Sequence, residues 1–373
     1  MARVTVLVSG GAGFIGSNLT RRLLASGEKV RVFDSLRGQV HDARPDLPDD
    51  IEFIHGDVRD ADAVKRALDG VNRVVHLAAA VGVGQSMYEI VDYTSSNALG
   101  FAVVLEAAAE ARDRIEKLVV ASSNTIYGEG RYRCSAEGAD VLAGMRSVEQ
   151  LKARDWEPKC PRCGAPLEPL PTDETKPLQP ASIYAIGKRD HEEMALVWGR
   201  AYGVATTALR FFSVYGRGQA LSNPYTGAVA IFASRMLNGR QPIVFEDGQQ
   251  MRDMVHVSDV VAALVAALDP GHGDGASINI GTGVPTTVTQ IAEALSRHLD
   301  IDVGVDYQNT FRAGDVRHCF ADVALARELL DFAPKMGFDE GIGDLSGWLV
   351  DQVTDAERLE VATTAMAERG LTL

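Results

Sequence analysis

The sequence predicts an α/β protein: a doubly wound parallel sheet joined to a smaller α/β lobe towards the C-terminus. Apolar strands alternate with helical stretches from residue 4 to about residue 210, a glycine-rich turn joins the first strand to the first helix, and shorter mixed elements follow. This alternation is typical of parallel sheets, because each crossover helix returns the chain to the same edge of the sheet.

The first elements form a β-α-β unit. The run from Val4 to Val8 is β-branched and apolar, as expected of a strand buried on both faces. Apolar residues recur at helical spacing from Ile15 to Leu24, and residues 28–34 predict the second strand. Further strands are expected at residues 51–55, 73–77, 117–121 and 205–210, and further helices at residues 61–68, 88–111 and 182–202.

Two stretches interrupt the alternation. From about residue 129 to residue 180 prolines are frequent and no periodicity is sustained, so we expect an insert that carries most of the cysteines. From residue 213 onward the elements are short: helices at residues 228–237, 258–268 and 287–299, and strands at residues 243–245 and 277–280. We therefore expect one domain at residues 1–212 and a substrate lobe at residues 213–373, some of whose segments return to the first domain.

Composition excludes several classes of partner. The chain has 373 residues, with 37 basic and 51 acidic side chains and a formal net charge of −14, which repels nucleic acid and anionic lipid. No apolar run approaches the roughly 18 residues of a membrane span, and no secretory leader is visible. With only four cysteines, the sequence predicts a cytoplasmic protein without a disulfide framework.

The glycine-rich turn predicts a dinucleotide site. Gly10, Gly13 and Gly16 stand where a strand passes into a helix, which allows a tight turn and a close approach of the backbone to a pyrophosphate. Asp34 ends the next strand and is placed to bind the ribose hydroxyls of NAD, whereas it would repel the 2′-phosphate of NADP. Arg37 is close to Asp34 in the sequence, so NADP remains an alternative cofactor.

A second pattern predicts catalysis. Tyr184 and Lys188 are four residues apart on one helix and therefore share a face. Lys188, together with a nicotinamide cation, is expected to lower the pKa of the Tyr184 phenol from its usual value near 10. Ser123 follows a predicted strand, at the edge of the sheet where the crevice opens.

Taken together, these motifs resemble the extended short-chain dehydrogenase/reductase family, the NAD-dependent sugar-nucleotide epimerases and dehydratases. The resemblance covers nearly the whole chain outside the insert, and it includes residues 56–58, 76–79 and 252–259. It implies a Rossmann-type, NAD-binding domain at residues 1–212. It also implies three catalytic residues, which are Ser123, Lys188, and Tyr184 as the acid and base. The cofactor-binding residues that it implies are Gly10, Gly13, Phe14, Ile15, Gly16, Asp34, Asp57, Val58, Leu77, Ala78, Ala79, Asn97, Tyr184 and Lys188.

The residues that follow Ser123 limit which reaction of the family this chain is expected to catalyse. Dehydratases of this family carry an Asp-Glu pair after the hydroxyl residue, where this chain has Asn124 and Thr125. The resemblance therefore implies a nucleotide-sugar 4-epimerase, which oxidises C4 of the sugar transiently and returns the hydride to its other face. A dehydrogenase or reductase, a dehydratase and a non-catalytic NAD-binding regulatory protein are the alternatives. The substrate-binding residues implied are Ser123, Asn124, Thr125, Ser213, Arg217, Arg252 and Arg312, the arginines contacting the diphosphate.

The insert adds a metal-binding pattern. Cys160 and Cys163 form a Cys-x-x-Cys knuckle, and Cys134 with Glu137 lies upstream at the same gap, which predicts a structural zinc site. His191 or His41 are alternatives to Glu137, and loop cysteines without a metal are the other interpretation. The insert also resembles that of the longer dTDP-L-rhamnose 4-epimerase-like proteins. Finally, the family resemblance implies a homodimer formed through the helices at residues 88–111 and 182–202.

Overall fold

A seven-stranded parallel sheet forms the centre of the protein. The computed structural model describes residues 4–41, 47–221, 223, 227–312, 314–350, 352, 361 and 364–372. The strand order is β13-β9-β5-β4-β1-β2-β3, and every neighbouring pair is parallel. The strands are β1 (Thr5–Ser9), β2 (Lys29–Asp34), β3 (Glu52–His55), β4 (Arg73–His76), β5 (Lys117–Ser123), β9 (Ala205–Phe211) and β13 (Ser277–Ile280). The predicted Rossmann-type doubly wound sheet is confirmed.

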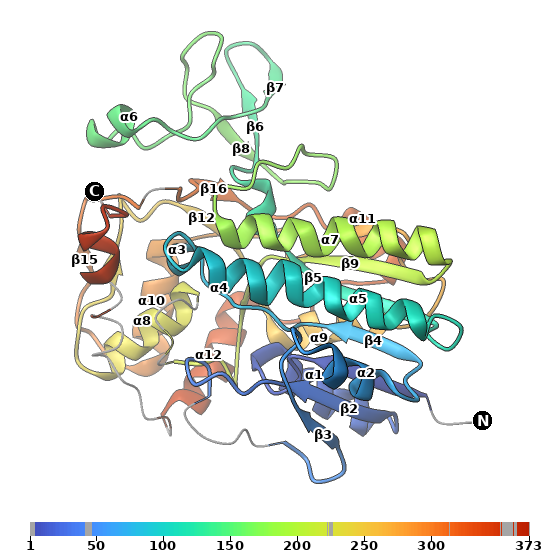
Figure 1. The fold of residues 1–373 in the computed structure, drawn as a ribbon. Helices are drawn as coiled ribbons and strands as arrows, with labels where there is room; N and C mark the ends of the chain where they lie inside the picture. Colours follow the sequence, from blue (N-terminus) through green and yellow to red (C-terminus); the bar gives the residue numbers. More distant parts are fainter. Residues whose placement is uncertain are drawn as a thin grey trace.

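Helices cover both faces of this sheet, as Figure 1 shows. On one face α1 (Phe14–Ala25) packs against α9 (Val257–Ala267), with α11 (Ala324–Leu330) beside them. The other face carries α2 (Ala61–Leu68), α5 (Gly100–Glu110) and α7 (Ile183–Tyr202). Each face encloses its own apolar core, and the two cores leave the carboxyl ends of the strands free to form a site.

The helix expected at residues 88–111 is interrupted. It consists of α4 (Ile90–Thr94), a π-helical turn η1 (Ser95–Leu99) and α5, with the short α3 (Val83–Ser86) before them. The π turn coincides with Asn97, whose buried side chain bonds the backbone of the strand-following segment at Ala80. Single π turns inside helices are frequent at functional sites.

The second lobe is smaller than residues 213–373. Its helices are α8 (Ala228–Leu237), α10 (Val288–Leu299) and α12 (Phe338–Leu349), and its strands are β10 (Ser213–Tyr215), β11 (Ile243–Val244), β12 (Met251–His256), β14 (Pro285–Thr287), β15 (Asp306–Tyr307) and β16 (His318–Cys319). Two elements within residues 213–373 return to the first domain. Strand β13 pairs with β9 at the edge of the large sheet, and α9 packs on α1.

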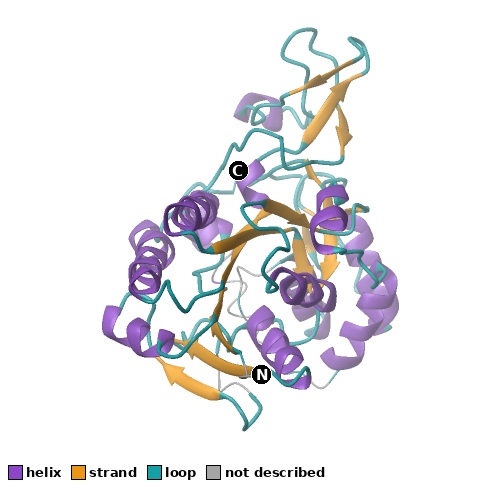
Figure 2. Ribbon diagram, turned by 90° about the vertical axis from the view of Figure 1, so that its right-hand side faces the viewer, coloured by secondary structure: helices purple, strands orange, loops and turns teal. Residues whose placement is uncertain are grey.

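The insert is a small antiparallel subdomain that projects from the body of the protein, as both views show (Figures 1 and 2). Strands β6 (Arg131–Cys134), β7 (Ala139–Val141) and β8 (Glu168–Leu170) form a sheet in the order β7-β6-β8, with helix α6 (Val148–Lys152) beside it. A separate core containing Tyr132, Cys134 and Cys160 holds it together. Across the described part of the chain, every helix is too short or too polar to cross a membrane.

Candidate active site

A cavity of about 630 Å³ lies at the carboxyl edge of the large sheet, between that sheet and the second lobe. Its wall contains most of the residues that the sequence predicted: Gly10, Gly13, Phe14, Ile15, Gly16, Asp34, Asp57, Val58, Leu77, Ala78, Ala79, Ser123, Thr125, Tyr184, Lys188, Ser213, Arg252 and Arg312. These residues come from the turns after β1, β3 and β4, from β2, β5, α1 and α7, and from the second lobe, so segments far apart in the sequence meet in one place.

The glycine-rich turn is a tightly packed backbone cradle, in which a Cβ would clash with neighbouring backbone. Gly10 has a φ of +72°, and a Cβ there would lie 2.7 Å from the backbone nitrogen of Ala78. A Cβ on Gly16 would lie 2.2 Å from the carbonyl oxygen of Gly10. Helix α1 begins at Phe14, and no side chain caps its first N–H groups. An exposed helix N-terminus beside glycine backbone fits a pyrophosphate.

Asp34 is fixed at the end of β2 beside this cradle. Its Oδ2 accepts a hydrogen bond from the backbone N–H of Ala12 at 3.0 Å, and its Oδ1 accepts one from Leu36 at 2.9 Å. Arg37, the residue that kept NADP open, forms an ion pair with Asp92 at 2.6 Å. A guanidinium already paired with a carboxylate is less available to a 2′-phosphate, so this arrangement favours NAD.

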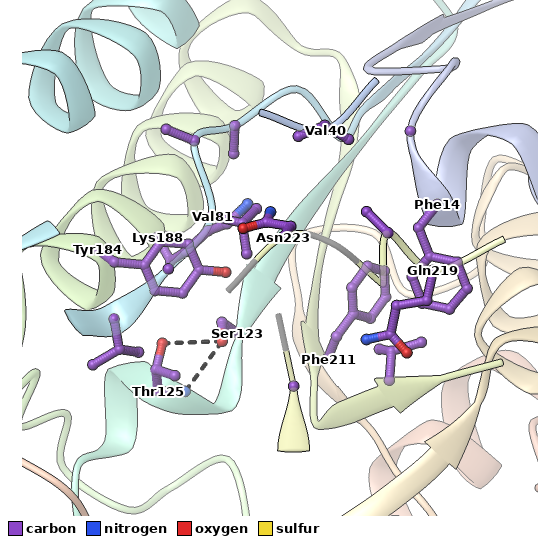
Figure 3. Close-up of a pocket in the computed structure, with 18 of the residues that line it drawn as sticks. Phe14, Val40, Val81, Ser123, Thr125, Tyr184, Lys188, Phe211, Gln219 and Asn223 are labelled. Carbon is purple, nitrogen blue, oxygen red and sulfur yellow. Dashed lines mark hydrogen bonds between the residues drawn. The ribbon is translucent and has the colours of Figure 1, made fainter. Parts of the chain in front are cut away.

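Ser123, Tyr184 and Lys188 face one another inside the cavity. Ser182 caps α7 by accepting a hydrogen bond from the backbone N–H of Ala185 at 3.1 Å, and Tyr184 and Lys188 follow on the first turns of the helix. In Figure 3 the Tyr184 ring points into the cavity on the side where Ser123 and Thr125 lie. The backbone N–H and the hydroxyl of Thr125 donate to Ser123 Oγ at 3.2 and 3.0 Å.

Burial shifts the pKa values of both Tyr184 and Lys188. Burial raises the pKa of Tyr184 to about 12, and the nearby Ser123 hydroxyl offsets only part of this rise. Burial lowers the pKa of Lys188 to about 8, and its ammonium donates to the carbonyl of Ala121 at 2.9 Å. Burial thus dominates both pKa shifts, and the lowering of the Tyr184 pKa expected from Lys188 together with a nicotinamide cation stays a prediction.

Three predicted residues lie outside the cavity wall. Asn97 lies behind the wall, where its Oδ1 accepts from the N–H of Ala80 at 2.7 Å and its Nδ2 donates to the carbonyl of Ala80 at 3.1 Å. Asn124 follows Ser123 but does not line the cavity. Arg217 is exposed and pairs with Asp344 at 2.7 Å. The structure thus brings Arg252 and Arg312 to the cavity and leaves Arg217 outside it.

Sequence reasoning missed part of the wall. Residues of α8, namely Val229, Ile231 and Phe232, and two residues near the C-terminus, Met366 and Leu371, line the cavity. The glycine before α8 and the apolar start of that helix were the available signal for the first group. The C-terminal pair belongs to no motif, and no pattern in the sequence points to it.

Arg252 and Arg312 are held by the second lobe. Arg252 donates to the carbonyl groups of Met251, Val316 and Arg317 at 2.8–3.0 Å. Arg312 pairs with Asp315 through bonds of 3.0 and 2.7 Å. Both guanidinium groups are therefore oriented before any ligand binds.

The insert reaches this part of the site through a buried charge network. Arg146 forms two bonds of 2.9 Å with Glu246 and donates to the carbonyl of Asp315 at 3.2 Å. Arg317, which is 1% exposed, binds Glu157 of the insert together with Glu246 and Asp247 of the lobe. The insert is therefore anchored on the residues that hold Arg252 and Arg312.

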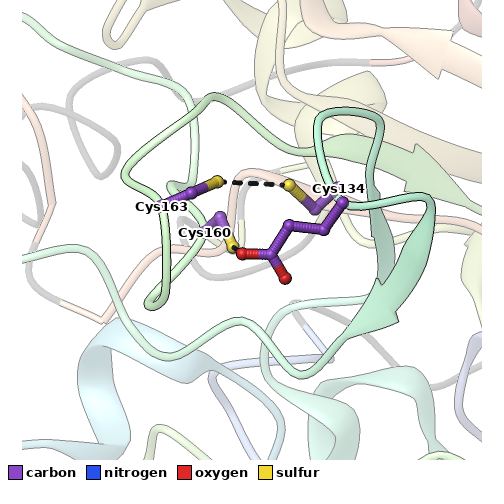
Figure 4. A group of neighbouring side chains, drawn as sticks. Cys134, Cys160 and Cys163 are labelled. Atoms are coloured by element: carbon purple, nitrogen blue, oxygen red, sulfur yellow. Dashed lines mark hydrogen bonds between the residues drawn. The ribbon is translucent and has the colours of Figure 1, made fainter.

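The four metal-ligand candidates of the insert meet in space (Figure 4). One ligand atom from each of Cys134, Glu137, Cys160 and Cys163 lies within 4.8 Å of the others. The Cys134 and Cys163 sulfurs are 3.5 Å apart, and Cys160 Sγ lies 3.7 Å from Glu137 Oε1. No disulfide joins the thiols.

The two histidines offered as alternatives to Glu137 are elsewhere. His41 Nε2 lies 3.9 Å from Asp34 in the cavity wall. His191 is buried on α7 against His76 and Phe101. Both alternatives are wrong, because the insert folds onto the second lobe and away from these positions.

Known proteins resemble this chain over nearly its whole length. The sequence model described as "NAD dependent epimerase/dehydratase family" matches residues 6–143 and 162–281. A dTDP-L-rhamnose 4-epimerase of Burkholderia thailandensis is 33% identical over 354 residues, 93% of this chain and 95% of that protein.

Two solved structures have the same fold. The UDP-glucose 4-epimerase of Thermotoga maritima, solved with UDP-glucose, is 29% identical with a TM-score of 0.77 and covers 93% of this chain and 99% of its own. The UDP-glucose 4-epimerase of Thermus thermophilus, solved with NAD, is 30% identical with a TM-score of 0.74 and covers 94% and 100%. The family resemblance inferred from the motifs is confirmed.

Proposed function

The chain belongs to the NAD dependent epimerase/dehydratase family of enzymes, and from this premise we propose that it is an NAD-dependent nucleotide-sugar 4-epimerase. One observation carries the proposal. Ser123, Tyr184 and Lys188 converge on a cavity that also contains the dinucleotide cradle and Arg252, while the position after Asn124 holds Thr125. Tyr184, among the described residues of the wall, offers a phenol for proton transfer, whereas Asn124 and Thr125 stand where an Asp-Glu pair for elimination would follow Ser123.

NAD fits the cradle because Gly10 and Gly16 allow the turn to pack tightly before the uncapped N-terminus of α1, and because Asp34 faces the cavity. When bound, NAD supplies the acceptor that takes the hydrogen of C4 and gives it back. We propose that the glycine turn holds the pyrophosphate, Asp34 the adenosine ribose, and Lys188 the nicotinamide ribose. Asp57 and Val58 are proposed for the adenine, and Leu77, Ala78 and Ala79 for the wall beside it.

The protein's own groups move the proton. We propose that Tyr184 acts as acid and base at the C4 hydroxyl. To take that proton it would have to be a phenolate, which Lys188 and a nicotinamide cation would stabilise against the burial that raises its pKa to about 12. Ser123, held by two bonds from Thr125, orients that hydroxyl. Arg252 and Arg312 bind the diphosphate and so keep the nucleotide in place while the sugar turns.

Isotope tracing tests the reaction class. The full-length protein is incubated with UDP-, dTDP- and GDP-sugars that carry deuterium at C4, and products are separated by chromatography. A 4-epimerase gives the C4 epimer with the deuterium retained and takes no solvent hydrogen at C3 or C5. Solvent hydrogen at C5 together with loss of water indicates a dehydratase, and net formation of reduced cofactor indicates a dehydrogenase; either result overturns the proposal.

We also propose that the insert binds one structural zinc ion through Cys134, Glu137, Cys160 and Cys163. Three thiols and one carboxylate converging within 4.8 Å match a tetrahedral zinc site in number and in kind of ligand. Metal analysis of the purified protein should give about one zinc per chain. Cys163→Ser should lose it, whereas Cys319→Ala, which removes a thiol from the core, should keep it. Parent protein purified without metal contradicts the proposal.

A homodimer and a cytoplasmic location complete the proposed function. Val91, Leu99, Ile186 and Val197 are exposed apolar residues on the neighbouring segments α4, η1 and α7. Light scattering after gel filtration should give twice the mass of the chain, and the double variant Val91→Asp/Val197→Asp should give the monomer. Unpaired thiols agree with a reducing compartment.

A further inference from the structure

The described C-terminal segment, residues 364–372, connects the two parts of the protein that line the cavity. Thr372 forms an antiparallel bridge with Arg312 of the second lobe. The guanidinium of Arg369 lies 4.5 Å from the centre of the Tyr88 ring. Met366 lies so close to Gly84 that a Cβ on that glycine would be 2.7 Å from the Met366 sulfur. The segment therefore contacts a diphosphate arginine on one side and the segment after β4 on the other.

The same segment contributes directly to the cavity wall. Met366 and Leu371 are half-buried and line the cavity together with Val81, Val83 and Met87. The backbone N–H of Leu371 donates to the carbonyl of Met366 at 3.0 Å, so a turn fixes the two side chains relative to each other. This part of the wall is apolar and uncharged.

We propose that residues 364–372 are part of the substrate site and that Met366 and Leu371 confine the sugar during the reaction. This inference rests on the proposed function. A 4-epimerase must let the 4-keto sugar turn over inside the cavity and must keep it there until C4 is reduced again. Strong hydrogen bonds to the sugar would prevent that turning, whereas an apolar wall limits the space without fixing one orientation.

Methionine suits this role. Its unbranched, flexible side chain adapts to different neighbours, so it can pack against either face of a sugar ring. The diphosphate stays bound at Arg252 and Arg312, and the bridge from Thr372 to Arg312 keeps the segment next to the anchored end of the substrate. The segment thus acts on the sugar, and the nucleotide is held elsewhere.

The first experiment compares Met366→Ala/Leu371→Ala with Glu368→Ala, an exposed residue of the same segment. The double variant should lower kcat/KM for the nucleotide sugar about tenfold or more, because two apolar contacts are lost. It should also lose activity during turnover, since a 4-keto sugar that escapes leaves its two electrons on the cofactor. Absorbance of reduced cofactor in the protein and free keto sugar in solution should rise together. Glu368→Ala should behave like the parent protein.

Affinity for the nucleoside diphosphate alone separates this role from a general loss of structure. The double variant should bind UDP or dTDP as tightly as the parent protein does, because the altered residues face the sugar. A chain that ends at residue 352 should show the same defects more strongly. If that truncated chain does not fold, the results for the double variant alone decide whether the inference holds.

Hydrogen exchange gives a result that does not depend on turnover. In the full-length protein with cofactor, exchange at residues 364–372 should slow when a nucleotide sugar binds and change less when the nucleoside diphosphate binds. This protection is expected even if the reaction differs from 4-epimerisation, so the two proposals fail separately. Two results together would overturn the inference. The double variant would show the kinetics of the parent protein and accumulate no reduced cofactor, and hydrogen exchange at residues 364–372 would be the same with and without the nucleotide sugar.

Discussion

Replacing Arg317 by methionine should lower the free energy of unfolding by about 3–5 kcal/mol, because the change strands carboxylates that share one buried guanidinium. Arg317 is 1% exposed and binds Glu157 of the insert at 2.6 Å, with Glu246 and Asp247 of the lobe at 3.1 and 2.7 Å. Methionine fills a similar space and offers no positive charge, so the variant isolates the electrostatic contribution.

The magnitude follows from the partners. Burial opposes ionisation of Glu157, but hydrogen bonds from His318 and Arg317 prevail and lower its pKa from 4.5 to about 2. That shift corresponds to about 3 kcal/mol, but the Glu157 side chain is 39% exposed. Water screens it, so we assign about 1–2 kcal/mol to this pair. The rest of the expected loss of stability comes from Glu246, which is 2% exposed and would be left with Arg146 as its ion-pair partner.

The sign of the pH dependence is fixed by the direction of the shift. Because the pKa of Glu157 is lower in the folded protein, its contribution is complete above about pH 4.5 and is lost as the pH falls towards 2. The parent protein should therefore lose more stability on acidification over that range than the variant does. At neutral pH the full difference between the two proteins should be seen.

Urea unfolding followed by circular dichroism and by tryptophan fluorescence measures the effect, and Trp156, beside Glu157, reports on the insert. The matched control is Arg133→Met, since Arg133 is an exposed arginine of the insert paired with Asp140. That control should cost less than about 0.5 kcal/mol. A loss below about 1 kcal/mol for Arg317→Met, or an unchanged acid response, would refute the reasoning.

Two further predictions concern the site, and a third concerns His191 in the core. Tyr184→Phe should reduce kcat by about 10²- to 10⁴-fold while leaving the melting temperature and bound cofactor unchanged; parent-like turnover would rule out the phenol as acid and base. Gly16→Ala should abolish cofactor binding, measured by cofactor content after purification, because its Cβ would lie 2.2 Å from the Gly10 carbonyl oxygen. Burial holds the pKa of His191 well below 6.5, so the unfolded chain takes up its proton first and stability falls as the pH drops below 6.5; His191→Phe should show a smaller loss of melting temperature between pH 7 and pH 5.

Local chemistry made much of the fold and the site predictable. The strands of the large sheet are buried apolar runs, and their positions could be read from the sequence because parallel strands leave few polar residues inside. The glycine turn and the Tyr184–Lys188 pair were also predictable. Each depends on contacts within one turn or one helix, and such contacts are encoded by spacing alone.

The features that could not be predicted from the sequence depend on contacts between segments that are far apart in the chain. The π turn at Ser95–Leu99 brings Asn97 to Ala80, and nothing in the helical period of that segment signals it. Strand β13 lies beside β9 at the edge of the large sheet, which its own residues do not signal. Arg217 meets Asp344 outside the cavity, a pairing between residues far apart in the chain. Similarly, the raised pKa of Tyr184 results from burial, which spacing does not report.

The two ends of the insert return to the same place in the protein. Gly130 donates its N–H to the carbonyl of His318 at 2.9 Å, Thr172 donates to Phe320 at 2.8 Å, and the Arg131 N–H meets the Thr172 hydroxyl at 3.1 Å. Backbone connectivity alone would thus let a short linker replace the subdomain. The charges left behind would also stay paired: excision removes Glu157 and Arg146, whereas Arg317 keeps Glu246 and Asp247 of the lobe as partners. Because paired charges that face water cost little free energy, a shortened chain could keep Arg317 and Glu246 unchanged.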